Sequence, residues 1–246
     1  MGKTKKKKDP LNTTMSLGDH LEELRLRLIL ALAGLLAGTI VCFCFGTRIV
    51  AFIQRPYNEL MPGRPLSMLG PADAFVGYMK ISLIAGLILS SPWVFYQVWL
   101  FVAAGLYARE KRYVHLAVPF SAALFVAGAL FFLYVVAPIS LAFFLKFGQL
   151  INVTPNWTFQ KYVSFVTMLM LVFGIGFQTP LAIFLLTKTG LVSIQALRRS
   201  RKYVLLGVFI VAAVATPPDA VSQVTLAIPL YGLFELGIFL SYLAKH

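Results

Sequence analysis

The longest uncharged run of the chain, LAVPFSAALFVAGALFFLYVVAPISLAFFL, extends from Leu116 to Leu145 and decides the class of fold. A helix of about 20 residues crosses the hydrocarbon layer of a bilayer, so this run is more than long enough to span it. Pro138 lies inside the run and cannot continue the hydrogen-bond ladder of a helix. We therefore predict a span that ends near Val136, followed by a bent or interfacial segment that carries Lys146.

Further apolar runs give the chain the composition of a membrane protein. Hydrophobic residues make up 59% of the 246 residues and charged residues only 13%, whereas about a quarter of the residues of soluble domains are charged. Long runs satisfy their backbone polar groups inside a bilayer only as helices, and no ten-residue alternation indicates a barrel. We predict an all-α integral membrane protein with six transmembrane helices in a single domain; seven spans is the alternative. The predicted domain covers residues 1–246, and its spans are 24–46, 78–104, 114–137, 161–187, 203–216 and 221–242.

The positive charges gather on one side of the predicted spans. Of the 22 lysine and arginine residues, 7 lie in residues 1–27, 3 in 105–115 and 5 in 188–202, and Lys245 is near the end of the chain. Basic residues are enriched in cytoplasmic loops, so both termini and the loops after the second and fourth spans are predicted to be cytoplasmic. Topology therefore accounts for the net charge of +13, and no nucleic-acid partner is expected.

Residues 1–15, which contain KTKKKK, are interpreted as a basic cytoplasmic tail that touches anionic membrane lipid. No small-residue cleavage site follows the first apolar run, so this run is expected to stay as an anchor. Cys42 and Cys44 would point about 200° apart on a helix, with no cluster of Cys or His nearby. We expect both to be buried small side chains, without a disulfide between them and without a metal site.

The segment SLGDHLEELRLRL, Ser16–Leu28, precedes the first span and carries a polar face. His20, Glu23 and Arg27 share this face at helical spacing, and Glu23 and Arg27 form an i, i+4 pair. The simplest interpretation is a solvated helix surface with an ordinary ion pair. A second acid, Glu110, lies in GLYAREKRY, among the bases of the loop after the second span.

Glu23 and Glu110 are predicted to lie at the same depth on the same side of the membrane, next to the ends of the first two spans. Basic neighbours of each carboxylate favour its charged form. Two such carboxylates can accept forked, bidentate hydrogen bonds from arginine, which lysine cannot donate in that geometry. The pattern indicates a receptor for a basic partner rather than a catalytic pair.

The chain resembles the TatC family, the multispan subunit of the twin-arginine protein translocase, over nearly its whole length. The segments that carry the resemblance are HLEELRLRL, SPWVFYQVWLFVAAGLYAREKR, SFVTMLMLVFGIGFQTPLAIFLL and RSRKYVLLGVFIVAAVATPPDAVSQVTLAIPLYGLFELGIF. The resemblance implies six helices in a concave, glove-like bundle with short helices 5 and 6. It also implies recognition of twin-arginine signal peptides and export of folded proteins across a bacterial or archaeal cytoplasmic membrane.

The family motifs assign residues of this chain to the signal-peptide site. The matching glutamates are Glu23 and Glu110, and Leu24 and Arg25 lie in the same N-terminal motif. Phe101 matches an aromatic residue of the family nine positions before the second glutamate. Nine helical residues rise about 14 Å, so Phe101 would lie deeper in the bilayer than Glu110. An ordinary core residue is the other interpretation of Phe101.

The resemblance also implies contacts with small single-span partner subunits of the TatA or TatB type. Thr216 and Gln223, around the turn TPPDAVSQ, match positions that contact the partner's helix, where a hydrogen bond in lipid contributes about 1 kcal/mol. Gln178 is a neutral amide that can bond to such a helix. The family commonly has glutamate there, and an amide cannot carry a proton. Ala104 stands where the family often has proline, so the bend expected after Phe101 lacks its usual cause.

Four other positions are marked as structural or functional. His20 lies on the polar motif face, and Pro56 matches a family position in outer loops that are expected to form a structural cap. Asp219 is expected to cap the helix after the TPP turn. Glu235 is the one acid placed within the bilayer, where acids are usually functional or paired, and the sequence indicates no partner for it.

The fifth predicted span is unusually short. Its 14 residues before the two prolines would extend only about 21 Å, less than the thickness of the hydrocarbon layer. A mismatch of this kind thins or deforms the surrounding bilayer, which gives a physical reason to place the working face of a translocase here.

Other classes of function find less support in the sequence. There is no HExxH and no GxSxG with a paired His, so we expect neither an enzyme nor a cofactor. A small-solute secondary transporter would show inverted repeats and a charged midplane site, and only Glu235 and Gln178 point that way. A structural scaffold would not account for the acids at the inner face. The resemblance implies dependence on the proton motive force and self-association in a receptor complex.

Overall fold

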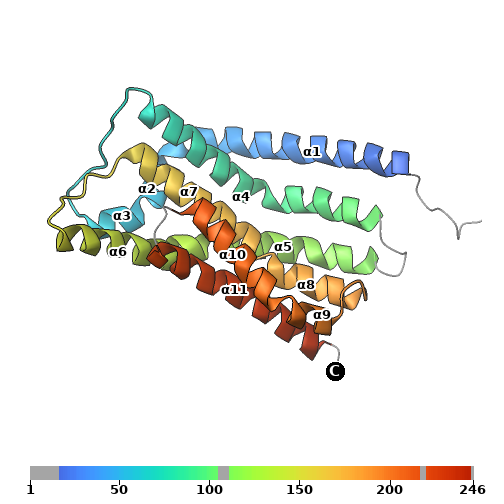
Figure 1. Cartoon of the computed structure of the whole chain (residues 1–246). Helices are drawn as coiled ribbons and strands as arrows, with labels where there is room; N and C mark the ends of the chain where they lie inside the picture. Colours follow the sequence, from blue (N-terminus) through green and yellow to red (C-terminus); the bar gives the residue numbers. More distant parts are fainter. Residues whose placement is uncertain (1–16, 105–110, 217–219, 245–246) are drawn as a thin grey trace, which may run out of the picture.

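The computed structural model describes residues 17–104, 111–216 and 220–244, and these are almost entirely helical (Figure 1). The all-α class is therefore confirmed. Within these described ranges, five helical segments are long and apolar enough to cross a membrane: His20–Cys44, Asp73–Ala103, Ala117–Leu150, Phe159–Lys188 and Ala220–Leu243. The segment predicted as the fifth span is the helix α10, Arg201–Ala215, whose 15 residues are fewer than these spans have.

The long spans run alongside one another, and two of them are interrupted. The third span consists of α5 (Lys111–Phe131), a π-helical turn η1 (Phe132–Val136) and α6 (Ala137–Leu150). The π turn lies directly before Pro138, whose missing N–H disturbs the regular ladder at the point where the sequence predicts a change. The fourth span is divided into α7 (Phe159–Gly176) and α8 (Thr179–Lys188), and Pro180 lies in the first turn of α8.

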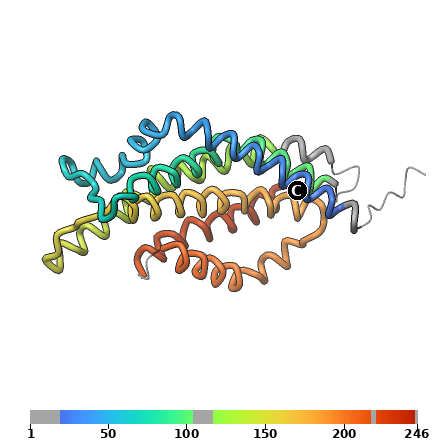
Figure 2. The backbone as a smooth tube through the Cα atoms, turned by 90° about the horizontal axis from the view of Figure 1, so that it is seen from above, coloured from blue at the N-terminus to red at the C-terminus, as the bar shows by residue number. Residues whose placement is uncertain are grey.

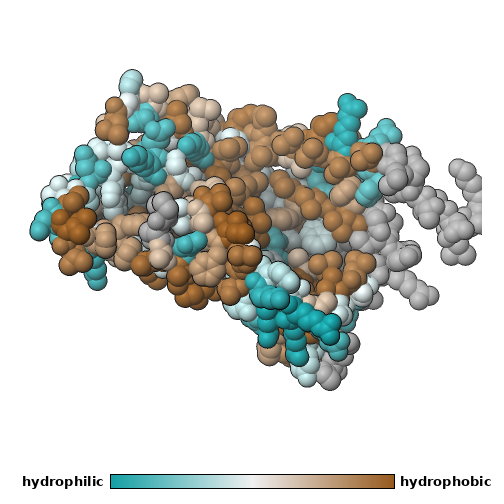
Figure 3. Space-filling view, in the orientation of Figure 1, coloured by the Kyte–Doolittle hydropathy of each residue, from teal (hydrophilic) through white to brown (hydrophobic). Residues whose placement is uncertain are grey.

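Two layers face each other across the fourth span. Seen from above, α1 (Leu17–Cys44) and α4 (Asp73–Ala104) lie on one side of the bundle, and α10 with α11 (Ala220–Leu243) on the other (Figure 2). Apolar side chains cover much of the middle of the bundle, and hydrophilic ones gather near its two ends (Figure 3). This distribution is the one that a bilayer imposes on a spanning bundle.

Small residues allow α1 and α4 to approach closely. A Cβ atom on Gly86 of α4 would lie 2.5 Å from the Cα atom of Thr39 on α1, and one on Gly38 would lie 2.7 Å from the Gly86 carbonyl oxygen. Van der Waals packing of this kind joins helices in lipid, where apolar side chains gain little by avoiding the solvent. The contact sets the position of α1 relative to α4 along most of their length.

Short helices close the end of the bundle where α4 begins. They are α2 (Gly46–Ile53) and α3 (Arg55–Leu60), and Pro56 is buried in the first turn of α3. The buried hydroxyl of Tyr162 donates a hydrogen bond to the carbonyl oxygen of Ile53 over 2.7 Å. The ring of Tyr57 packs on that of Tyr162, with 5.6 Å between centroids. Pro56 is thus buried beside the tyrosine whose ring packs in this cap.

Cys42 and Cys44 are both free thiols on α1, as expected. The prediction that both are buried is wrong for Cys44, which is exposed. Residues two apart on a helix face nearly opposite directions, and α1 packs on one side only, so one of the two thiols must point away from the bundle.

Candidate functional site

The start of α1 meets the end of α4, because the two helices are antiparallel neighbours (Figure 1). The imidazole ring of His20 stacks on the ring of Phe101, with 4.6 Å between centroids and 24° between planes. The stacking joins two residues that the sequence marks separately. It places the N-terminal motif directly against the last turn of the second span.

A chain of polar contacts continues one turn further along α1. One guanidinium nitrogen of Arg27 lies 3.3 Å from Oε1 of Glu23, and the other donates to Oε1 of Gln97 on α4, also over 3.3 Å. Both distances are at the long end for hydrogen bonds. Gln97 is only 2% exposed, and the buried Nε of Arg27 has no hydrogen-bond partner among the described residues. The i, i+4 pair predicted from the sequence is confirmed, and Gln97 is a partner that sequence reasoning missed.

The remaining residues of the motif point elsewhere. Leu24 and Arg25 are both exposed, so they extend beyond the network that holds Glu23 and Arg27. Glu110 lies outside the described residues, in the segment 105–110 that joins α4 to α5. The end of α4 and the start of α5 lie at the same end of the bundle as the start of α1 (Figure 1).

The side chain of Gln178, at the break between α7 and α8, contacts other parts of this chain. Its amide NH2 donates to the carbonyl oxygen of Ser121 over 3.0 Å, with a weaker 3.5 Å contact to the Gly174 carbonyl. The hydroxyl of the same Ser121 accepts a hydrogen bond from the indole N–H of Trp99 over 2.8 Å. Gln178 thereby connects the break to α5 and α4.

Two polar side chains lie where α10 and α11 approach their common turn. The buried hydroxyl of Thr216 donates to the carbonyl oxygen of Ala212 over 2.8 Å. The side-chain amide of Gln223 on α11 donates to the carbonyl oxygen of Phe209 on α10 over 3.1 Å. The first bond lies within the end of α10, and the second joins the two helices of the hairpin. Asp219, expected to cap α11, lies outside the described residues.

Glu235 has the partners that the sequence did not indicate. One carboxylate oxygen lies 2.7 Å from a guanidinium nitrogen of Arg201, at the start of α10, and the other accepts a hydrogen bond from the hydroxyl of Tyr231 over 2.9 Å. Acids placed within membranes are commonly neutralised by pairing, and here the cation comes from the neighbouring helix. In the part of the chain that is described, no three side chains of His, Cys, Asp or Glu gather as metal ligands would.

Several helices are long and apolar enough to span a membrane, and the two ion pairs, Glu23–Arg27 and Arg201–Glu235, lie towards one end of the bundle. These features define a class, that of multispan membrane proteins with charged side chains near one membrane surface. The family model described as Sec-independent protein translocase protein (TatC) matches residues 19–229. The chain belongs to the TatC family.

Individual relatives and a solved structure agree with this assignment. The chain is 38% identical to the Sec-independent protein translocase protein TatC of Helicobacter pylori strain J99, over 90% of this chain and 87% of that protein. It is 38% identical to the protein of the same name from Aquifex aeolicus, over 94% of this chain and 96% of the relative. A crystal structure of the twin-arginine translocase receptor TatC superposes with a TM-score of 0.84 at 37% identity, covering 92% of this chain and all of that one.

Proposed function

We propose that this protein is the signal-peptide receptor and core subunit of a twin-arginine translocase. It recognises paired arginines in the signal peptides of folded proteins and takes part in their export. The observation that carries the proposal is the contact between the N-terminal motif and the end of α4. It consists of the His20–Phe101 stack and the Arg27–Gln97 hydrogen bond. The matched family and the relatives are named as protein translocase components. These names support neither a small-solute transporter nor an enzyme.

Glu23 is the first docking point in this proposal. Its Oε1 atom accepts from Arg27, and its Oε2 atom has no partner among the described residues, which leaves lone pairs for a second guanidinium group. Arg27 holds the carboxylate in one orientation through Gln97, so the acid is positioned before the peptide arrives. An oriented carboxylate favours the planar, forked guanidinium over the point charge of lysine.

Glu110 supplies the second carboxylate. Its chain neighbours, the end of α4 and the start of α5, lie at the same end of the bundle as the start of α1, which supports a shared site (Figure 1). Leu24 presents an exposed apolar surface to the residues next to the twin arginines, and Arg25 lies on the same exposed surface. Phe101 positions the motif by stacking on His20.

We further propose six spans in one domain, with α10 as the short fifth span and both termini in the cytoplasm. The basic tail, 1–15, would then meet anionic lipid of the cytoplasmic membrane. The 15 residues of α10 rise about 22 Å, so the bilayer around this hairpin would be thinned, and the bundle would form the concave, glove-like shape.

Partner subunits would meet the chain near this hairpin. Thr216 and Gln223 lie at the α10–α11 turn, where the helix of a small TatA- or TatB-type subunit would pack. Gln178, at the α7–α8 break, would have to exchange its bond to Ser121 for one to the partner. Asp219 and Glu235 would hold the hairpin in shape. Export would use the proton motive force, and copies of the receptor would associate in the working complex.

Photocrosslinking of a signal peptide tests the receptor assignment. A photoreactive residue placed directly beside the twin arginines should form adducts with residues 20–27 and near Phe101. Glu23→Ala and Glu110→Gln should each abolish these adducts while the protein still folds, and a twin-lysine peptide should react poorly with the parent. Adducts confined to the α10–α11 hairpin, or adducts unchanged in both variants, would refute the assignment.

A further inference from the structure

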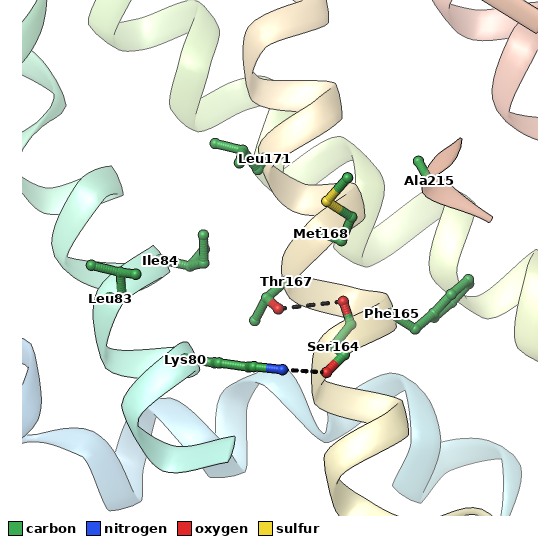
Figure 4. Close-up of a pocket in the computed structure, with 9 residues that line it drawn as sticks. All are labelled: Lys80, Leu83, Ile84, Ser164, Phe165, Thr167, Met168, Leu171 and Ala215. Atoms are coloured by element: carbon green, nitrogen blue, oxygen red, sulfur yellow. Dashed lines mark hydrogen bonds between the residues drawn. The ribbon is translucent and has the colours of Figure 1, made fainter. Parts of the chain in front are cut away.

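A groove of about 540 Å³ lies between α4 and α7 (Figure 4). It is lined from the first half of α4, whereas the proposed peptide site lies at the other end of that helix. Its walls are mostly apolar, and the end of α10 borders it through Ala215. The polar groups that line it are those of Lys80, Ser164 and Thr167. Thr167 is already used, since its hydroxyl donates to the carbonyl oxygen of Val163 over 2.7 Å.

Lys80 brings a positive charge into this apolar groove. Its ammonium group donates to the hydroxyl oxygen of Ser164 over 2.8 Å (Figure 4). Among the described residues the acids that form ion pairs are Glu23 and Glu235, and neither pairs with Lys80. Lys80 lies seven residues, about 10 Å, along α4 from its start. A cation inside a bilayer is stabilised by an anion, and no acid among the described residues lies within ion-pair distance of Lys80.

We propose that this groove binds an anionic phospholipid, such as phosphatidylglycerol, from the leaflet on the α2–α3 side. A phosphate oxygen accepts hydrogen bonds from the two remaining N–H groups of Lys80. Ser164 accepts from Lys80 and donates its own hydroxyl proton to the same phosphate, because a hydroxyl is both donor and acceptor. One acyl chain lies along Leu83 and Met168 towards Leu171.

The exposure of the walls favours a lipid. Leu83 is 48% exposed and Met168 is 39% exposed, so the groove opens towards the surrounding acyl chains. An acyl chain gains little free energy when it leaves the surrounding lipid for an apolar protein wall. The walls of the groove therefore fit the shape of an acyl chain but contribute little to the affinity. The charge at Lys80 therefore decides which headgroup is preferred. A zwitterionic headgroup carries its own cation, which competes with Lys80 for the phosphate.

Lipid retention by the purified, delipidated full chain tests the proposal. Native mass spectrometry with added phosphatidylglycerol or phosphatidylcholine should show preferential retention of phosphatidylglycerol by the parent. Lys80→Gln should weaken that retention about fivefold, the effect of roughly one membrane-surface charge, and Lys80→Arg should preserve it. Lys146→Gln is the matched control, because Lys146 is an exposed lysine on α6 that does not line the groove, and it should change nothing.

Several results would overturn the proposal. Equal retention of both lipids by the parent would do so, as would equal losses in Lys80→Gln and Lys146→Gln. Inorganic phosphate that displaces the lipid at comparable concentration would assign the site to a free anion. If Lys80→Gln changes only the binding of a co-purified single-span protein and not the retention of lipid, the groove would be assigned to the helix of that protein. If Lys80→Gln does not fold, Ser164→Ala keeps the cation and should still reduce the preference for phosphatidylglycerol.

Discussion

At the scale of single residues, the site depends on one glutamine in the uncharged part of α4 that follows Lys80. Gln97 is almost completely buried and accepts from Arg27, which in turn contacts the Glu23 carboxylate. The spacing of the motif was enough to predict the Glu23–Arg27 pair, because residues four apart on a helix are neighbours. Gln97 could not be found in that way, since its partner lies 70 positions earlier in the chain. The helical periodicity of α4 marks no special face there.

Gln97→Leu should lower the free energy of unfolding by about 1–3 kcal/mol, because it leaves the half-buried guanidinium of Arg27 with one partner fewer. Denaturant unfolding in a fixed detergent measures the change. It should also weaken binding of a twin-arginine peptide, since Glu23 would lose its orientation. Gln149→Leu is the control, because Gln149 is exposed on α6, and it should change neither quantity. An unaltered peptide affinity in a folded Gln97→Leu variant would contradict the positioning role.

Glu235 shows the same limit of sequence reasoning. Its placement within an apolar run was enough to predict that it is functional or paired, but not which, and its cation, Arg201, lies 34 positions away. Only the packing of α10 against α11 brings the two together. The weak signal in the sequence was that Arg201 begins a helix adjacent in the chain.

At the scale of elements, the α1–α4 pair determines where the site lies. Gly38 and Gly86 allow the backbones to approach, and Gly34 leaves room for the ring of Trp93. The spacing GLLAG, 34–38, is the signal for this helix packing in the sequence. Helix existence was predictable from the apolar runs. The interruption near Val136 was predicted from Pro138, but its form, a π turn, and the break before Thr179 were not, because they depend on how neighbouring helices satisfy the freed backbone groups.

Gly86→Ala should destabilise the protein by about 1–3 kcal/mol, because the new Cβ would lie 2.5 Å from the backbone of Thr39 and the helices would have to separate. Thermal unfolding reports the loss. Gly207→Ala on α10 is the matched control, since nothing lies within 4 Å of its added Cβ and alanine favours helix by up to about 1 kcal/mol. Equal stability of the two variants would show that the close approach is not important.

At the scale of the whole molecule, the number of spans depends on α10. Among the described residues, five segments have the length of a spanning helix, and α10 with 15 residues does not. Counting the apolar runs predicts six spans. Because six is an even number, both termini would lie on the same side of the membrane. Length alone cannot decide whether a short helix crosses, because the bilayer can adapt to it.

A nitroxide probe at position 214 should test this. Val214 is 74% exposed near the end of α10, so a label there should disturb the packing little. In a variant without Cys42 and Cys44, we expect this label to be accessible to a water-soluble relaxation agent, as at a thinned bilayer surface. A label at Leu130 in α5 should stay inaccessible. Deep burial of both labels in the hydrocarbon layer would contradict the thinning.

The central claim is that two carboxylates, Glu23 and Glu110, receive the paired guanidinium groups of an exported protein. A double-mutant cycle on peptide affinity tests it most directly, with twin-arginine and twin-lysine peptides bound to the parent, Glu23→Gln, Glu110→Gln and the double variant. The parent should prefer arginine by about tenfold or more, and each substitution should remove most of that preference. Glu59→Gln, at an exposed acid on α3, should leave the preference intact. A preference for arginine that survives in the double variant would contradict the account.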